Sequence, residues 1–354
     1  MVTLKEIARE CNVSATTVSN ILNGKPKVSE ETRIRVLDVV KKRGYQPNYI
    51  AQGLRNQKTK TIGIIAEDIS QFSTPGMIES IMACCEEKGY RTIVQNLRLY
   101  ARWKESWYNN EEAYRSVLEP ALQELRSIKV DGVIYVAGHA RIIHFFPEDF
   151  SMPVVLAYAY TNADWIPSVV IEEEKGGYDM MKYLLSMGHR EIGIIGGRAD
   201  NIHTQKRLLG IQKAMFEEQV PYNPGWVRYG AWDRKSGYEQ AGPLVDAGVS
   251  AIFCMADRMA GGVYDYLEEH GLRAGEDISV TGFDNQDLSE YFRPALTTMS
   301  LPLSEIGHKA AEMLLERIGG EEKEAEEEAA EERTAEIKIP CSIVLRNSVK
   351  RKQP

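Results

Sequence analysis

The stretch Thr3–Leu22, TLKEIARECNVSATTVSNIL, decides the fold of the amino-terminal segment. Its first half has apolar residues at helical spacing, and Thr3 followed by Glu6 is typical of a capping box, so a helix over 4–10 is expected. After a short turn, Ser14 is a good N-cap for a second helix that ends near residue 22. Two short helices joined by a tight turn indicate a helix-turn-helix.

The outward face of the second helix carries small hydroxyl and amide side chains. Such groups can reach base edges in the major groove, and a helix N-terminus can bind phosphates. A third helix is expected after Ser29 and up to Gly44, and its buried face is expected to consist mostly of Ile34, Val36, Leu37 and Val40. The alternative is a plain three-helix bundle with a polar surface.

Charge is distributed unevenly along the chain of 354 residues. Residues 1–60 contain 12 Lys and Arg against 5 Asp and Glu, so they carry +7, whereas the whole chain carries −8 and the remainder therefore −15. A small basic head on an acidic body is expected if only the head contacts a polyanion. Charge alone leaves open a basic surface with no partner.

The body after residue 60 alternates apolar strands with amphipathic helices. A first round runs from a strand at 61–66 to a strand at 132–136, and a second from a helix at 176–187 to a strand at 279–282. Strand–helix alternation with short turns predicts two doubly wound parallel-sheet subdomains, with ligands bound between them at the carboxyl ends of the strands.

Several function classes find no support in the sequence. The five cysteines fit no metal-binding spacing, and a nucleophile–base pair or P-loop is not found, so neither an enzyme nor a metal or cofactor is expected. The sequence shows no signal-peptide pattern and no long apolar run, which predicts a cytoplasmic protein with reduced thiols and without a membrane partner.

Motifs along nearly the whole chain resemble the lactose-repressor (LacI/GalR) family. The matching stretches are TLKEIA, VSATTVSNILNG, VSEETRIRV and GYQPNYIAQGLR in the first 60 residues, followed by VDGVI, GHR, IIGG, RLLG, ADRMA, GFDN and PALTT. The resemblance implies a periplasmic-binding-protein-like core whose chain crosses between its halves three times. The implied domains are a helix-turn-helix over 1–47, a hinge helix and linker over 48–60, and an effector-binding and dimerisation core over 61–354. Within that core, the N-subdomain is expected at about 61–158 and 291–335, and the C-subdomain at about 159–290 and 336–350.

The same resemblance assigns roles in DNA binding. The implied base-reading residues are Ala15, Thr16 and Asn20, with Leu54 as an apolar wedge in the minor groove. The implied phosphate-binding residues are Ser14, Thr17, Ser19, Lys27, Ser29, Tyr45 and Asn48. The expected operator is a near-palindrome bound by a homodimer or a tetramer.

An effector site is expected between the halves of the core. The implied residues are Phe72, Ser73, Asn201, His203, Arg207, Trp232, Asp257 and Asp284. An aromatic plate surrounded by arginine, aspartate and asparagine suits a sugar, because these groups stack on sugar rings and hydrogen-bond hydroxyls. Taken singly, Trp232 could instead be a half-buried core residue, Asp284 a turn cap and Arg207 a surface ion pair.

Two segments depart from the expected pattern. Residues 97–110, LRLYARWKESWYNN, form an insertion of about ten residues whose aromatic side chains either cover the cleft or pack on the surface, with packing favoured. Residues 321–333 contain eight Glu and are expected to form a solvated helix or a flexible loop, with a docking tail for a basic partner as the alternative.

These observations predict a repressor whose affinity for operator DNA depends on a small effector, with a sugar favoured. A family member controlled by another protein is the nearest alternative. A solute-binding protein for transport is more distant, because such a protein should have a signal peptide and no helix-turn-helix.

Overall fold

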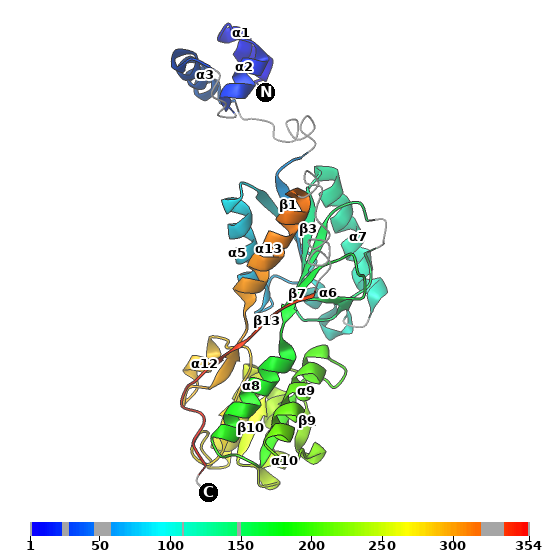
Figure 1. Ribbon diagram of the computed structural model, residues 1–354, viewed down its shortest axis with the longest axis vertical. Coiled ribbons are helices and arrows are strands. Elements are labelled where there is room, and N and C mark those ends of the chain that lie inside the picture. The colour runs from blue at the N-terminus through cyan, green and yellow to red at the C-terminus, as the bar shows by residue number, and fades with distance from the viewer. Residues whose placement is uncertain are drawn as a thin grey trace. The chain divides into compact units, whose positions relative to one another are not determined.

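A computed structural model describes residues 2–22, 28–45, 58–107, 110–146, 150–319 and 336–352. Contacts divide the chain into two units, Met1–Thr59 and Lys60–Pro354, which are called the head and the core below. Figure 1 shows the elements of each unit. The predicted hinge helix, the residues Lys27, Asn48 and Leu54, and the acidic segment 321–333 lie outside the described residues.

The head consists of α1 (Leu4–Glu10), α2 (Ala15–Leu22) and α3 (Glu30–Arg43). The capping box is present: the Thr3 hydroxyl accepts a hydrogen bond from the Glu6 backbone N–H, and the Thr3 N–H donates to the Glu6 carboxylate at 2.7 Å. The three helices bury Ile7, Val18 and Val36 completely.

One prediction for α3 is wrong. Ile34 and Leu37 were expected to be buried, but they are 55% and 43% exposed, whereas Val36 is buried. The face of α3 that packs on the head core carries Val36, Val39 and Val40, which are three or four positions apart, and Ile34 and Leu37 lie away from that face.

The first half of the core, called the N-half, is a six-stranded parallel sheet. Its strand order is β13 (Glu336–Ile339), β7 (Ser168–Ile171), β5 (Val154–Ala157), β3 (Gly132–Val136), β1 (Thr61–Ala66) and β2 (Arg91–Asn96). Helices α5 (Thr74–Glu87) and α13 (Leu303–Gly319) cover one face and α7 (Glu111–Ile128) covers the other (Figure 1). Successive β1 residues alternate between the two hydrophobic cores, with Ile64 on the α5 side and Ile65 on the α7 side.

The remaining N-half elements are short. They are α6 (Leu99–Trp103), the 3-10 turn η1 (Lys104–Trp107), and the pair β4 (Ile142–Ile143) and β6 (Tyr160–Thr161).

The second half of the core, called the C-half, contains a four-stranded parallel sheet. Its order is β11 (Ser279–Thr281), β10 (Ala251–Cys254), β8 (Ile192–Gly196) and β9 (Val227–Tyr229). The helices are α8 (Glu173–Ser186), α9 (Ile202–Glu217), α10 (Arg234–Asp246), α11 (Asp257–Glu269) and the short α12 (Leu288–Tyr291), with a 3-10 turn η2 (Pro224–Trp226). Gly193 and Gly196 both lie on β8. A Cβ on Gly193 would contact Leu244 of α10, whereas one on Gly196 would contact Thr204 of α9, so α10 and α9 cover opposite faces of this sheet.

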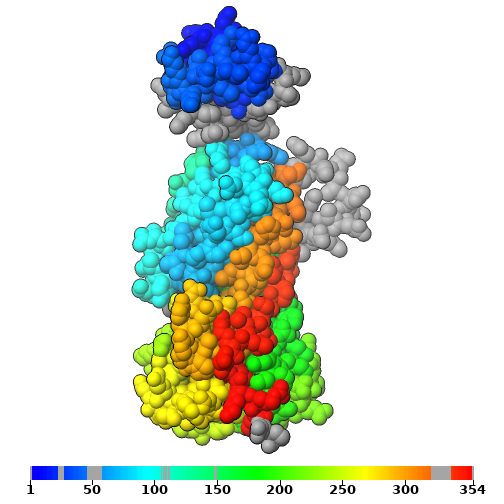
Figure 2. Space-filling model, turned by 90° about the vertical axis from the view of Figure 1, so that its left-hand side faces the viewer, coloured from blue at the N-terminus to red at the C-terminus, as the bar shows by residue number. Residues whose placement is uncertain are grey.

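The chain crosses between the halves three times, after β7, before α13 and after β13. Strand β12 (Thr298–Ser300) pairs with β14 (Ser342–Val344) beside the C-half sheet. In Figure 2 the carboxy-terminal segment, coloured red, runs along both halves of the core.

The expected subdomain boundaries need correction. All four residues of β7 are buried and the strand pairs with β5, so the N-half extends to residue 171 rather than 158. Strand β13 pairs with β7 and therefore belongs to the N-half, although the division at 336 assigned it to the C-half. Because β12 lies with the C-half, the chain returns to the N-half just before α13 and not at 291.

Candidate functional site

The exposed face of α2 presents the predicted base-reading side chains. The Ser14 hydroxyl accepts a hydrogen bond from the Thr17 backbone N–H at 3.0 Å and so caps α2. Thr16 is exposed and Ala15 and Asn20 are half-buried, so these side chains lie at the surface of the head. Polar groups on the second helix of a helix-turn-helix are the ones that enter the major groove.

Three further predicted phosphate-binding residues of the head lie within the described residues. Ser19 is half-buried on α2, and the Ser29 hydroxyl contacts that of Thr32 at 2.9 Å just before α3. Tyr45 packs against the head core.

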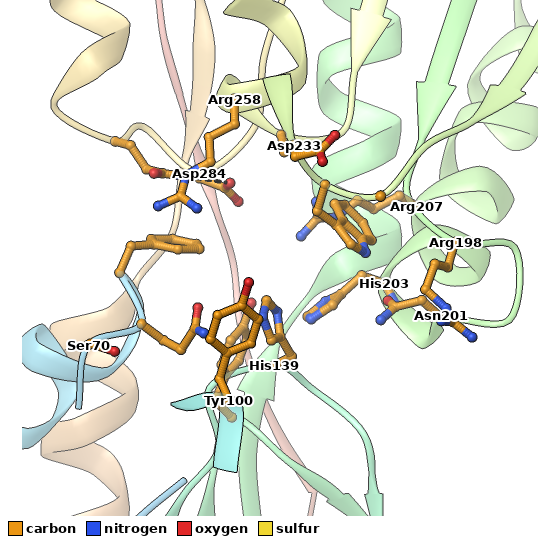
Figure 3. A pocket seen from close by; sticks show the side chains of 17 residues that line it. Ser70, Tyr100, His139, Arg198, Asn201, His203, Arg207, Asp233, Arg258 and Asp284 are labelled. Atoms are coloured by element: carbon orange, nitrogen blue, oxygen red, sulfur yellow. Dashed lines mark hydrogen bonds between the residues drawn. The ribbon is translucent and has the colours of Figure 1, made fainter. Parts of the chain in front are cut away.

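A cavity of about 380 Å³ lies between the two halves of the core. Six of the eight predicted effector residues line it: Phe72, Asn201, His203, Arg207, Trp232 and Asp284. The cavity is also lined by Ser70, Gln71, Tyr100, His139, Tyr158, Arg198, Ala231, Asp233, Ala256, Arg258 and Gln286. Figure 3 shows these side chains converging from strand ends of both halves, which is where open parallel sheets bind ligands.

Arg207 is only 2% exposed and forms a buried ion pair rather than a surface one. Its Nε donates to Glu173 Oε2 at 2.6 Å and its Nη1 donates to the Met255 carbonyl at 2.7 Å. The guanidinium also stacks on the Phe283 ring, with its carbon 3.5 Å from the ring centre. Nη2 has no hydrogen-bond partner among the described residues, so it is the nitrogen that can donate to a molecule in the cavity.

Glu173 joins Arg207 to His203. Its second oxygen, Oε1, lies 2.5 Å from His203 Nδ1. Burial alone would raise the pKa of Glu173, but Arg207 and His203 outweigh burial and lower this pKa to about 2. Glu173 is therefore a buried carboxylate that holds both side chains in place.

His203 connects the two halves of the core. Its Nε2 accepts a hydrogen bond from the Ala140 backbone N–H, which lies after β3 in the N-half, at 3.0 Å. Because Nε2 is an acceptor here, the neutral ring carries its proton on Nδ1, where it can donate to Glu173. Both ring nitrogens are therefore engaged, so His203 contributes its ring faces to the cavity rather than a free nitrogen.

The backbone at the cavity is locally strained. Trp232 has φ 63° and Asp284 has φ 111°, which are uncommon angles for residues that carry a side chain. The Trp232 indole occupies space left by Gly197, because a Cβ there would come within 1.9 Å of the indole. Trp232 both packs against the hydrophobic core and lines the cavity, so the two expectations for this residue do not exclude each other.

Two predicted effector residues do not line the cavity. Asp257 is fully buried behind its wall, where its carboxylate accepts hydrogen bonds from the Thr298 hydroxyl at 2.5 Å and the Gln286 backbone N–H at 2.7 Å. Ser73 is also fully buried and donates to the Gly138 carbonyl at 2.8 Å. Both residues tie cavity loops together, so they position the site rather than contact its contents.

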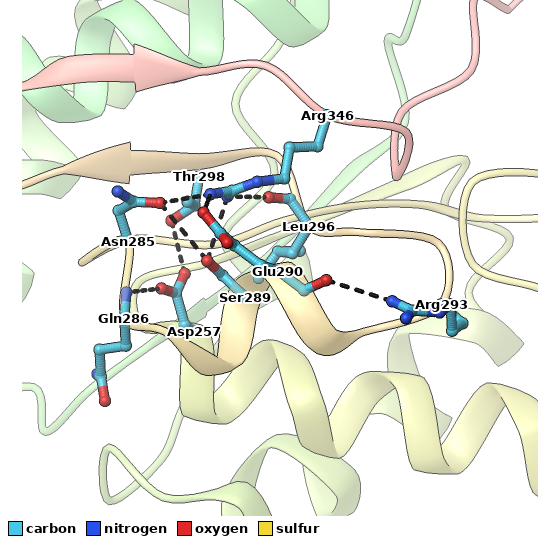
Figure 4. Close-up of polar contacts among 9 residues, drawn as sticks. All are labelled: Asp257, Asn285, Gln286, Ser289, Glu290, Arg293, Leu296, Thr298 and Arg346. Carbon is cyan, nitrogen blue, oxygen red and sulfur yellow. Dashed lines mark hydrogen bonds and ion pairs between the residues drawn. The ribbon is translucent and has the colours of Figure 1, made fainter.

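A polar network around Arg346 fixes the loop that follows Asp284 (Figure 4). Arg346 donates to the Asn285 side-chain carbonyl at 2.9 Å and to the Leu296 backbone carbonyl at 2.8 Å, and it pairs with Glu290 at 3.0 Å. The network links the end of β14 to the loop before α12, so the last crossing segment supports the cavity wall.

The insertion after β2 was expected either to cover the cleft or to pack on the surface, and its aromatic side chains do both. Tyr100 of α6 lines the cavity, whereas Trp103 packs against the N-half core. Trp107 and Tyr108 have no described side chains. The buried side chain of Leu99 and the hydrogen bond from the Ala101 N–H to Asp68 anchor α6.

Sequence reasoning missed several lining residues, among them His139, Asp233 and Arg258. Each follows the end of a strand, which is the signal that could have found them. Arg258 stands in the ADRMA motif directly after Asp257, at the start of α11.

None of the described helices is long and apolar enough to cross a membrane. Within the described residues, His, Cys, Asp and Glu side chains form no group that could hold a metal ion.

Comparison with known proteins agrees with this architecture. Residues 3–48 match the family described as "Bacterial regulatory proteins, lacI family", and residues 181–349 match a "Periplasmic binding protein-like domain". The "HTH-type transcriptional repressor PurR" of Escherichia coli O139:H28 is 34% identical over 329 residues, which cover 92% of each chain.

Solved structures share the fold. The crystal structure of the lac repressor dimer bound to operator and the anti-inducer ONPF has a TM-score of 0.78 at 24% identity, covering 99% of both chains. A complex of the transcriptional regulator CelR with cellobiose has a TM-score of 0.65 at 23% identity, covering 98% of this chain and 100% of that one. With its helix-turn-helix head and periplasmic-binding-protein-like core, this chain belongs to the lacI family of bacterial regulatory proteins and is a transcriptional regulator.

Proposed function

We propose that this protein represses transcription from a near-palindromic operator, which it binds as a homodimer, and that a small polar ligand in the cleft controls this binding. The observation that carries the proposal is the presence, in one chain, of a helix-turn-helix and a ligand-sized cavity between two sheet domains. A repressor acts where its DNA is, so the proposal places the protein in the cytoplasm.

The chemistry of the cavity favours a carbohydrate as the ligand. Trp232 and Phe72 supply aromatic faces, Arg207 Nη2 and Asn201 supply donors, and Asp284 supplies a carboxyl group. Burial, followed by the neighbouring Asp257, raises the pKa of Asp284 well above its usual range, which favours a protonated carboxyl that can also donate. The cellobiose complex of CelR is a relative of the same fold with a sugar ligand.

The His203–Ala140 hydrogen bond offers a route from ligand to DNA. It joins the N-half and the C-half beside the cavity. A ligand that displaces the loop after β3 or the start of α9 therefore changes how the two halves are held together. A two-state change of this kind typically couples two sites by about 1–3 kcal/mol.

A regulator controlled by a second protein is the alternative within the family. The polar, ligand-sized cavity favours a small molecule over it. Thermal-shift screening with a panel of sugars distinguishes the two, because a ligand that binds only the folded state stabilises it by mass action. A panel without effect, together with a protein co-effector that tightens operator binding, would favour the alternative.

The head assignment predicts the effect of Thr16→Ala and Asn20→Ala. Each loses a side chain proposed to read a base edge, so specific operator affinity should fall by about 1–3 kcal/mol, or roughly 5- to 150-fold, while binding to random DNA stays nearly unchanged. Fluorescence anisotropy with both DNAs measures the ratio. Asp38→Ala, an exposed change on α3, is the control and should keep the ratio of the wild type. Unaltered specificity in both variants would refute the assignment.

A further inference from the structure

Arg258 lines the cavity without a partner. It is the second residue of α11, it is exposed to solvent, and it forms no ion pair or hydrogen bond with any described residue. The other two lining arginines are engaged, since Arg198 pairs with Asp200 and Arg207 with Glu173. Figure 3 shows the Arg258 side chain directed into the cavity. Within the described part of the chain, a cation without a counter-ion therefore faces the space that a ligand would fill.

The N-terminus of α11 lies at the same wall. Its N-cap residue, Ala256, lines the cavity and has no side chain that can cap the helix. Among the described residues, the backbone N–H groups of Arg258 and Met259 have no acceptor. The first turn of a helix carries partial positive charge and free N–H donors, so it adds to the attraction that Arg258 exerts on an anion.

Among the described residues, the acidic side chains near this wall form no ion pair with Arg258, although the hydrogen bonds of Ser236 lower the pKa of Asp233 and keep it ionised. Asp233 is held by capping α10, where it accepts a hydrogen bond from the Ser236 N–H at 2.8 Å. Asp257 is held by Thr298 and Gln286, and burial raises its pKa to about 7. The pKa of Asp284 is also raised, mainly by burial, which favours its uncharged form.

His139 is a titratable side chain at the same cavity. Its side chain lines the cavity and has no hydrogen-bond partner among the described residues. Burial first, and then the neighbouring His203 and Arg258, lower the pKa of His139 to about 4. The arginines and acidic residues that line the cavity with it are Arg198, Arg207, Arg258, Asp233 and Asp284.

We propose that the cleft ligand carries an anionic group, a carboxylate or a phosphate, which Arg258 and the N-terminus of α11 bind. This inference rests on the proposed function of the cleft and narrows its ligand from a carbohydrate in general to an acidic one, such as a sugar acid or a sugar phosphate. Arginine and helix N-termini are both preferred partners of such groups. Trp232 remains available to stack on the sugar ring, and Arg207 Nη2 remains available to donate to the sugar hydroxyls.

The decisive test uses inorganic phosphate as the smallest probe and His139 as the reporter. In the full-length protein, the imidazole pKa of His139 is followed by NMR with and without phosphate at matched ionic strength, and the signal is assigned with His139→Gln. Phosphate should raise this pKa by about one unit, as an opposite charge within a few ångströms does. Arg258→Gln should abolish the phosphate-induced change, whereas Arg273→Gln, a surface arginine paired with Asp277, should retain it.

A second arm separates the sources of the anion. Thermal shifts are measured with D-glucuronate, D-glucose 6-phosphate and D-glucose for the wild type and both arginine variants. One of the two acids should stabilise the wild type more than glucose does, and Arg258→Gln should remove that preference.

The outcomes separate this inference from the proposed function. A His139 pKa that phosphate does not change, or changes equally in Arg258→Gln, would overturn the inference, and so would glucose stabilising as strongly as the acids. In the last case the proposed function still stands, because a sugar occupies the cleft. If none of the sugars binds, the phosphate titration decides alone.

Discussion

Glu173→Gln should destabilise the folded protein by about 3–5 kcal/mol, because it leaves the buried guanidinium of Arg207 without its counter-charge. Both partners lie in the protein interior, with Glu173 1% and Arg207 2% exposed. Glutamine has nearly the same shape, so the change isolates the charge. Urea denaturation of the full-length protein, followed by tryptophan fluorescence, measures the difference in the free energy of unfolding.

Glu174→Gln is the matched control. Glu174 is the next residue of α8 and is exposed, so its loss should change stability by less than about 0.5 kcal/mol. If Glu173→Gln lowered the free energy of unfolding no more than Glu174→Gln does, the buried ion pair would not be what holds Arg207 in place.

The pH dependence of the same pair has a defined sign. The folded-state pKa of Glu173 is about 2, below its usual 4.5. A lowered carboxyl pKa stabilises the protein above pH 4.5, and this contribution is lost as the pH falls towards 2. The difference in stability between the wild type and Glu173→Gln should therefore be largest near neutrality and shrink across that range.

Arg207→Lys should weaken ligand binding at least tenfold, which corresponds to about 1.4 kcal/mol. The guanidinium donates at once to Glu173 and to Met255 and stacks on Phe283, which leaves Nη2 for the ligand. A lysine ammonium cannot hold this planar set of contacts. Isothermal titration with the strongest ligand from the sugar panel measures the loss.

Arg273→Lys provides the control for this change. Arg273 is 66% exposed and pairs with Glu276 and Asp277 on the surface, so ligand affinity should be that of the wild type. Equal affinities in Arg207→Lys and Arg273→Lys would mean that Arg207 is only structural.

The head could be predicted largely from local sequence. Thr3 and Glu6 form the expected capping box, and Ser14 caps α2, because capping depends on residues three positions apart. The burial of α3 could not be predicted in the same way. Whether Leu37 is covered depends on which face of α3 packs on the head core, and that is a property of tertiary packing.

In the core, the spacing of apolar residues predicted the strands but not which strand each of them pairs with. Strand β13 lies far in sequence from β7, and an alternating four-residue stretch does not reveal which sheet it joins. The boundary at 336 was misplaced for this reason.

The cleft shows a similar limit. Positions after strand ends correctly indicated the loops that meet there, yet Asp257 and Ser73 turn into the protein to bind Thr298 and Gly138. Side-chain direction depends on neighbours that the sequence pattern does not reveal. Tyr100 belongs to an insertion for which the family resemblance offers no counterpart.

The central claim is that the occupant of the cleft sets the affinity of the head for DNA. Its most direct test is fluorescence anisotropy of the full-length protein with an operator selected in vitro, measured without and with a saturating ligand that stabilises the core. The account predicts that the ligand changes the operator Kd by about 5- to 150-fold in either direction, and that Arg207→Lys loses this response at the same ligand concentration. An operator Kd that does not change when the ligand is shown to be bound would contradict it.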